Sequence, residues 1–142
     1  MDKKKDLASK LRTSGLRPTK QRIKLAEFLF NREKTFHFTV ENLDKAINKK
    51  SSDDKIALAT IYNTVHAFKK AGHLKEILIK EGKNYFDTNT TSHHHFYDEF
   101  NNELTDIENN KIELKKLPIP PKGKSIKDVN VIINIDNDNQ KH

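Results

Sequence analysis

The segment "IALATIYNTVHAFKKAG", residues 56–72, decides the fold, because its apolar residues recur at the spacing of an α-helix. Ile61, Val65 and Phe68 form one stripe, and Gly72 after two lysines marks the end of the helix. The next two runs, "LKEILIK" and "NYFDT", are rich in β-forming residues and flank a glycine turn, which predicts a hairpin. Three short helices followed by a hairpin are the order of a winged helix-turn-helix, and this segment would be the third helix, which lies in the DNA major groove.

Three further helices are expected upstream of this segment. Residues 3–14 form a short charged helix that Gly15 ends, and a second helix opens at Pro18 in "PTKQRIKLAEFLF". Thr39 is a plausible N-cap for "VENLDKAINKK", and "SSDDK" then forms a loop before the decisive helix. Together these elements predict a small helical domain that carries a β-hairpin wing.

Charge divides the chain into two unequal halves. Residues 1–86 hold 20 Lys and Arg against 10 Asp and Glu, a balance of +10. Residues 87–142 hold 7 against 10, a balance of −3. A basic half suggests a polyanion-binding module joined to another part, and the alternative is a lysine-rich solvated surface.

The second half predicts a small sheet. "HHFYDEF" and "ELTDI" are expected to be strands joined across Asn101 and Asn102, and "ENNKIELKK" could be a short helix. "LPIPPKGKS" is too rich in proline for regular structure, and "KDVNVIINID" is a last strand with Val129, Val131 and Ile133 on one face. Because only 34% of the chain is hydrophobic, the core is thin, and exposed strand edges predict a homodimer.

Composition also excludes several classes of site. The chain has no cysteine, which removes disulfides, thiolate zinc sites and cysteine nucleophiles. No apolar run is long enough to span a membrane, and the start "MDKKKDLASK" has no signal region. The expected location is therefore the cytoplasm.

The run "SHHHFY", residues 92–97, leaves three readings open: a metal site, a haem site or a solvated polar turn. Because successive strand residues point to opposite faces, His93 and His95 can converge while His94 points away. Part of the run would then stay exposed and available to haem.

A family resemblance becomes visible when these pieces are taken in order. "SGLRPTKQRIKLAEFL", "FHFTVENL", "ALATIYNTVHAFKKAGHL", "GKNYFD" and "HHH" resemble the ferric uptake regulator (Fur) family, over roughly residues 10–136. "YFDTNTTSHHHFYDEFNNELTDI" looks like the iron response regulator (Irr) branch, which is associated with haem and iron status. The resemblance implies an α+β fold. It places an N-terminal winged helix-turn-helix domain at 1–88, a hinge at 89–92, a small α/β dimerisation domain at 93–136 and a tail at 137–142.

The resemblance implies ligands at the hinge for Fe, Mn or Zn, or for haem. One metal site would use His37, Asp87 and His95, with Tyr97 a possible fourth ligand. A second site would keep His94 and Glu113, and haem would bind at the run of His93, His94 and His95. The chain departs from the family in lacking the CxxC pairs of a structural zinc site.

For DNA, the resemblance implies that Tyr62 contacts thymine methyl groups and Asn63 a base edge. It places Arg17 near the minor groove and Arg22 at a phosphate, although both could be solvated helix charges. Thr19 and Thr60 complete the expected set of DNA-binding residues.

The sequence as a whole predicts a homodimeric transcription regulator of iron or haem homeostasis, without catalysis. Metal or haem at the hinge would set the affinity for a double-stranded operator. One alternative is a DNA-binding dimer with degenerate metal sites. The other is a His/carboxylate metalloenzyme, which no glycine-rich loop, nucleophile elbow or HExxH motif supports.

Overall fold

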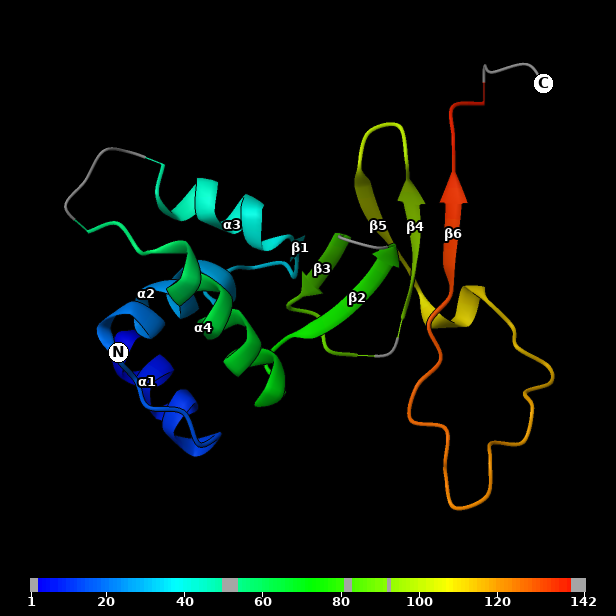
Figure 1. Ribbon diagram of the computed structural model, residues 1–142, viewed down its shortest axis with the longest axis horizontal. Coiled ribbons are helices and arrows are strands. Elements are labelled where there is room, and N and C mark those ends of the chain that lie inside the picture. The colour runs from blue at the N-terminus through cyan, green and yellow to red at the C-terminus, as the bar shows by residue number, and fades with distance from the viewer. Residues whose placement is uncertain (1–2, 50–53, 81–82, 92, 139–142) are drawn as a thin grey trace. The chain divides into compact units, whose positions relative to one another are not determined.

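The computed structural model describes residues 3–49, 54–80, 83–91 and 93–138, which divide into two units after Thr90. The first unit contains α1 (Lys3–Thr13), α2 (Lys20–Phe30), β1 (His37–Phe38), α3 (Val40–Ile47), α4 (Leu58–Lys70), β2 (Lys75–Lys80) and β3 (Lys83–Asp87) (Figure 1). The second contains β4 (His94–Asp98), β5 (Glu103–Ile107), the 3-10 turn η1 (Asn109–Lys111) and β6 (Ile132–Ile135). Most of the predicted "SSDDK" loop, Glu81 and Gly82 of the wing turn, Ser92 and the last four residues lie outside the described residues.

Side-chain caps set where the helices begin. Thr19 accepts a hydrogen bond from the backbone N–H of Arg22 at 3.2 Å, so α2 begins at Lys20 and not at Pro18. Thr39 caps α3 as predicted, in a capping box with Asn42. None of the described helices is long and apolar enough to cross a membrane.

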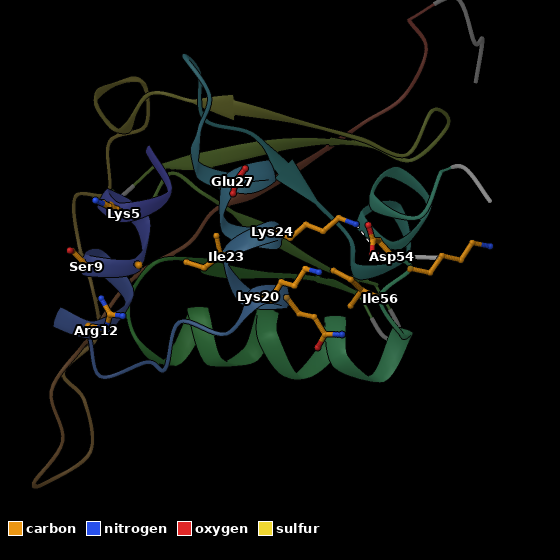
Figure 2. Close-up of a pocket in the computed structure, with 12 residues that line it drawn as sticks. Lys5, Ser9, Arg12, Lys20, Ile23, Lys24, Glu27, Asp54 and Ile56 are labelled. Atoms are coloured by element: carbon orange, nitrogen blue, oxygen red, sulfur yellow. Dashed lines mark hydrogen bonds between the residues drawn. The ribbon is translucent and has the colours of Figure 1, made fainter. Parts of the chain in front are cut away.

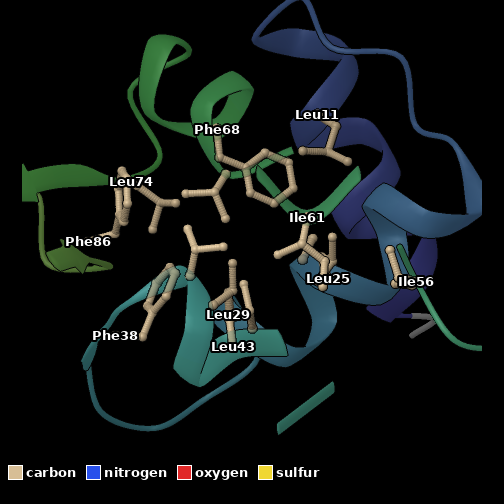
Figure 3. Close-up of a cluster of buried hydrophobic side chains, with 13 residues drawn as sticks. Leu11, Leu25, Leu29, Phe38, Leu43, Ile56, Ile61, Phe68, Leu74 and Phe86 are labelled. Atoms are coloured by element: carbon tan, nitrogen blue, oxygen red, sulfur yellow. The ribbon is translucent and has the colours of Figure 1, made fainter. Parts of the chain in front are cut away.

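The predicted stripe of α4 is confirmed, because Ile61, Val65 and Phe68 are fully buried. Figure 3 shows the hydrophobic cluster that they join, which draws side chains from α1, α2, α3 and β3. Burying each large apolar side chain contributes about 1.5–3 kcal/mol, so this cluster holds the helices and the wing together as one unit. The outward face of α4 is thereby fixed as well.

The wing is part of a three-stranded sheet in the order β1-β3-β2, with antiparallel pairing throughout. The hairpin of β2 and β3 was predicted, but strand β1 was not. His37 therefore lies in a strand and not in a loop before α3. A strand of two residues is too short to show the alternation by which strands are recognised.

The second unit is a sheet in the order β5-β4-β6, with β4 antiparallel to β5 and parallel to β6. The turn between β4 and β5 passes through Asn102 at a φ of 56°, a conformation that asparagine tolerates. The helix expected over 108–116 is wrong: only the 3-10 turn η1 forms there, because asparagine favours turns over helix interiors. The predicted α+β class is confirmed by the helical first unit and the sheet of the second.

Candidate functional site

Two histidines of the second unit share one carboxylate oxygen. The Nε2 atoms of His93 and His95 lie 3.3 Å and 3.2 Å from Oδ1 of Asp106. Their ring centroids are 4.4 Å apart. Because His95 and Asp106 are direct partners in the β4–β5 ladder, the strand register itself brings the imidazole and the carboxylate together.

His94 faces the opposite side of the sheet. Its Nδ1 accepts a hydrogen bond from the backbone N–H of Val131 at 3.0 Å, just before β6. The predicted alternation along the run is therefore confirmed. The expectation of an exposed part of the run is wrong, since His93, His94 and His95 are all buried. His94 and His95 belong to the central strand of the sheet, which has a neighbour on each side, and His93 immediately precedes it.

A second His–Asp pair lies in the first unit. His37 of β1 and Asp87 of β3 are direct partners in an antiparallel ladder. Their ligand atoms lie within 4.8 Å of each other. The Oδ1 atom of Asp87 also accepts a hydrogen bond from the backbone N–H of Asn89 at 2.9 Å. Each unit thus builds a His–Asp pair by the same means, strand register.

The chemistry of these groups fits a divalent metal. Imidazole nitrogen and carboxylate oxygen together suit Fe²⁺, Mn²⁺ or Zn²⁺, and no thiolate is available to favour softer ions. The second unit offers two imidazoles and one carboxylate on one face of its sheet. The sequence interpretation included His95 but missed Asp106. A hairpin register centred between Phe100 and Asn101 places Asp106 opposite His95, whereas one centred on the predicted Asn101–Asn102 turn would place Glu108 there.

The other predicted ligands have different surroundings. Tyr97 is buried and its hydroxyl donates to Oδ1 of Asn102 at 2.9 Å. Glu113 is exposed in the irregular segment after η1. Among the described residues, no group of three potential metal ligands includes His94 or Glu113. The structure thus gathers neither of these residues with further ligands.

The outer face of α4 presents the predicted base-reading residues. Tyr62 and Asn63 are exposed, and Thr60 is half-buried. The Tyr62 hydroxyl donates to Oε1 of Glu41 at 3.0 Å, and its ring stacks on His66 with centroids 6.2 Å apart. The hydrogen bond to Glu41, and then its negative charge, raise the pKa of Tyr62 above its ordinary value.

The residues before α2 form a small hydrogen-bonded loop. Arg17 is exposed, and its carbonyl accepts a hydrogen bond from the Arg22 guanidinium at 3.1 Å. Thr19 uses its hydroxyl oxygen as the helix cap. Arg17 and Thr19 are thus exposed, whereas Arg22 is half-buried.

A basic pocket of about 930 Å³ adjoins this loop (Figure 2). Its apolar floor includes Ile23 and Ile56, and Lys24 donates to the carbonyl of Asp54 at 3.0 Å. Five of its lining side chains are cationic, namely Lys5, Arg12, Lys20, Lys24 and Lys55, against the carboxylates of Glu27 and Asp54. Such a concentration of positive charge favours a polyanion.

Comparison with known proteins identifies the family. The pattern described as "Ferric uptake regulator family" matches residues 13–134. The peroxide-responsive repressor PerR of Staphylococcus epidermidis is 32% identical over 97 residues, which are 68% of this chain and 62% of that protein. The peroxide operon regulator of Bacillus subtilis is 31% identical over 91 residues, 64% of this chain and 60% of that one. The chain thus spans about three-fifths of the length of these curated relatives.

Solved structures agree on the fold. The ferric uptake regulator of Pseudomonas aeruginosa with manganese has a TM-score of 0.67 at 23% identity and covers 92% of this chain and 96% of its own. That of Vibrio cholerae has a TM-score of 0.69 at 19% identity and covers 92% and 99%. Neither match supports any branch within the family. The chain belongs to the ferric uptake regulator family, whose members are transcription regulators and not enzymes.

Proposed function

We propose that this protein is a cytoplasmic transcription regulator that binds double-stranded DNA as a homodimer and responds to a divalent metal. For the DNA part, support comes from α4, which buries one stripe and exposes Tyr62 and Asn63 on the other side. The wing of β2 and β3 follows directly, and the basic pocket adds cations for the phosphate backbone. Residues of α4 would read the bases, and contacts with the phosphates would orient the protein on the DNA.

For the metal, we propose five ligands: His37 and Asp87 from the first unit, and His93, His95 and Asp106 from the second. The observation that carries this proposal is that each unit already pairs a histidine with an aspartate across neighbouring strands. A bound metal would supply a cationic cross-link between the two units, so that part of its binding free energy fixes the angle at which α4 meets DNA. His93 and Asp106 extend the three ligands expected from the sequence.

A second metal site at His94 and Glu113 would be weak, because two protein ligands hold a divalent ion poorly. His94 already uses Nδ1 to accept the Val131 N–H, which leaves Nε2 for a metal. We propose that this pair is filled only at high metal concentration, and that Tyr97 stays with Asn102.

Haem and peroxide are the two finer candidates for the signal. Haem would have to displace His93 or His95 from Asp106, which makes it a competitor of the metal in our proposal. Peroxide is favoured by the relatives, which are named peroxide-responsive repressor and peroxide operon regulator. Because the chain has no cysteine, a peroxide response could not proceed through a thiol.

The test is an operator titration. The operator is first selected by the full-length protein with Mn²⁺ from a random duplex pool, and affinity is then measured with chelator, Mn²⁺, Fe²⁺, Zn²⁺ or haem. The proposal expects Mn²⁺ or Fe²⁺ to change affinity by at least about fivefold, the lower end of typical coupling between sites. Equal affinity in all conditions, chelator included, would mean a metal-independent DNA-binding dimer.

A further inference from the structure

An exposed tyrosine ring on α4 contacts other residues on two sides. Tyr62 keeps 39% of its surface accessible, yet its hydroxyl donates to Oε1 of Glu41 at 3.0 Å. His66 lies one turn further along α4 and stacks on the Tyr62 ring, with an angle of 16° between the ring planes. His66 in turn meets the edge of Phe86, a buried core residue of β3, with centroids 5.8 Å apart. The face of the Tyr62 ring therefore contacts the core through His66, and its hydroxyl is hydrogen-bonded to α3 through Glu41.

Glu41 lies on a capped helix whose inner face packs into the core. Glu41 occupies the first turn of α3, which starts with the capping box of Thr39 and Asn42. Its neighbours Val40 and Leu43 are buried in the core of the first unit. Glu41 is itself exposed, so it has no core-packing role of its own. Its side chain instead accepts the hydrogen bond from the Tyr62 hydroxyl.

We propose that Glu41 is a positioning residue that fixes the orientation of Tyr62 for reading bases. This inference rests on the proposed role of α4 in DNA recognition. An unrestrained tyrosine on a helix surface samples more than one rotamer and loses that freedom when it binds. Because Glu41 and His66 remove the freedom beforehand, the ring meets the major groove in one orientation. The side-chain entropy that Tyr62 no longer loses on binding corresponds to a gain of about 2- to 10-fold in DNA affinity.

The carboxylate also has an opposite effect, which makes the inference falsifiable. Glu41 is a negative charge beside a surface that would approach phosphates, and repulsion alone would weaken binding to every sequence equally. If repulsion outweighs positioning, removal of Glu41 raises affinity. If positioning dominates, removal lowers affinity, and it does so only while the Tyr62 hydroxyl is present.

The first experiment needs no DNA. In full-length protein with isotope-labelled tyrosine rings, Tyr62→Phe identifies the Tyr62 resonance among those of Tyr62, Tyr85 and Tyr97. In Glu41→Ala that resonance should move toward the position of a solvated tyrosine, and ionisation of Tyr62 should begin at lower pH, since Glu41 raises its pKa. Glu33→Ala removes an exposed carboxylate elsewhere in the same unit and should change neither. An unchanged resonance in Glu41→Ala would overturn the inference.

The second experiment is a double-mutant cycle on the selected operator with Mn²⁺ present. Glu41→Ala should weaken binding about 2- to 10-fold in the wild-type background, and it should leave binding unchanged or stronger in the Tyr62→Phe background, where only the repulsion is removed. Glu41→Gln, which keeps an acceptor oxygen, should retain most of the affinity. Replacing operator thymines by uracil, which lacks the methyl group, should reduce the effect of Glu41→Ala.

The outcomes separate this inference from the proposed function. An equal loss in both backgrounds, or a gain in affinity in the wild-type background, overturns the positioning role while DNA recognition by α4 stands. If Tyr62→Ala leaves sequence preference intact, α4 is not the reader. The proposed mode of recognition then fails together with the role of Glu41, even where the resonance experiment confirms the contact.

Discussion

His95 and Asp106 lie directly opposite each other in the β4–β5 ladder, with the imidazole Nε2 3.2 Å from the carboxylate Oδ1. His37 and Asp87 repeat this relationship across β1 and β3. In both pairs the spacing of the imidazole and the carboxylate is set by backbone hydrogen bonds between strands and not by a loop that must become ordered. Rigid placement of this kind is what a metal site requires, because ligands held in advance reduce the entropy lost on binding.

Asp106→Asn should abolish the metal response without unfolding the protein. The amide keeps an acceptor oxygen for a histidine but removes the negative charge that a divalent cation needs, so metal affinity should fall at least about tenfold. Glu103→Gln is the matched control, because it removes the same charge from the opposite face of β5. Calorimetric metal titration measures both variants, and wild-type affinity in Asp106→Asn would exclude Asp106 as a ligand.

The basic pocket should contribute to DNA affinity but not to sequence preference. Arg12→Gln or Lys20→Gln should each flatten the dependence of log K on log salt by about one unit, if each cation meets one phosphate. The ratio of affinities for the operator and a scrambled duplex should not change, because phosphates carry no sequence information. Lys111→Gln in the second unit is the control, and an unchanged slope in both pocket variants would remove the pocket from the interface.

His73 should make the stability of the first unit depend on pH. Its ring packs against Phe30 and Phe68, and its Nε2 lies 2.7 Å from the Ser14 hydroxyl. Burial, and secondarily the charge of Lys10, lower the pKa of His73 below its ordinary 6.5. The unfolded chain then binds more protons than the folded one between these two pKa values. The contribution of His73 to stability is therefore fully present above pH 6.5. It declines as the pH falls from there toward the folded-state pKa.

The measurement is thermal unfolding of wild type and His73→Gln over a series of pH values, with chelator present. Relative to His73→Gln, the wild type should lose stability as the pH drops below 6.5. Because the two proteins differ only at position 73, the change of this difference with pH isolates His73. His66→Gln, which changes an exposed ring, should track the wild type. Parallel curves for His73→Gln and wild type would contradict the prediction.

The sequence predicted those features that depend on local periodicity. The α4 stripe of Ile61, Val65 and Phe68 repeats at helical spacing, and its burial follows from that repeat. The alternation of His93, His94 and His95 likewise depends only on the two-residue period of a strand. Thr39 was recognised as a cap because a capping residue acts on its own first turn.

Features that depend on register between distant segments were missed. Asp106 is one acidic residue among many until the β4–β5 register places it against His95. Strand β1 has two residues and exists because β3 offers it a free edge, which no local pattern reveals. The Glu41–Tyr62 contact joins α3 to α4 across 21 positions and depends on how those helices pack.

The final prediction concerns the apolar face of the second sheet. Phe96 and Ile133 are neighbours in the β4–β6 ladder and line a pocket of about 440 Å³ together with Ile107. Ile133 is 38% exposed in a single chain, which leaves an apolar patch that a second copy would cover. Ile133→Asp should therefore weaken the dimer at least about tenfold, because an unpaired carboxylate would be buried at the interface. Sedimentation equilibrium at low micromolar concentration measures this change. Ile119→Ser is the control: Ile119 is more exposed, at 93%, but lies outside the sheet, so the dimer should persist. Operator affinity should fall with dimerisation in Ile133→Asp, since two linked winged helices bind a two-fold site more tightly than separate ones. A dimer as stable as wild type in Ile133→Asp would place the interface on another surface.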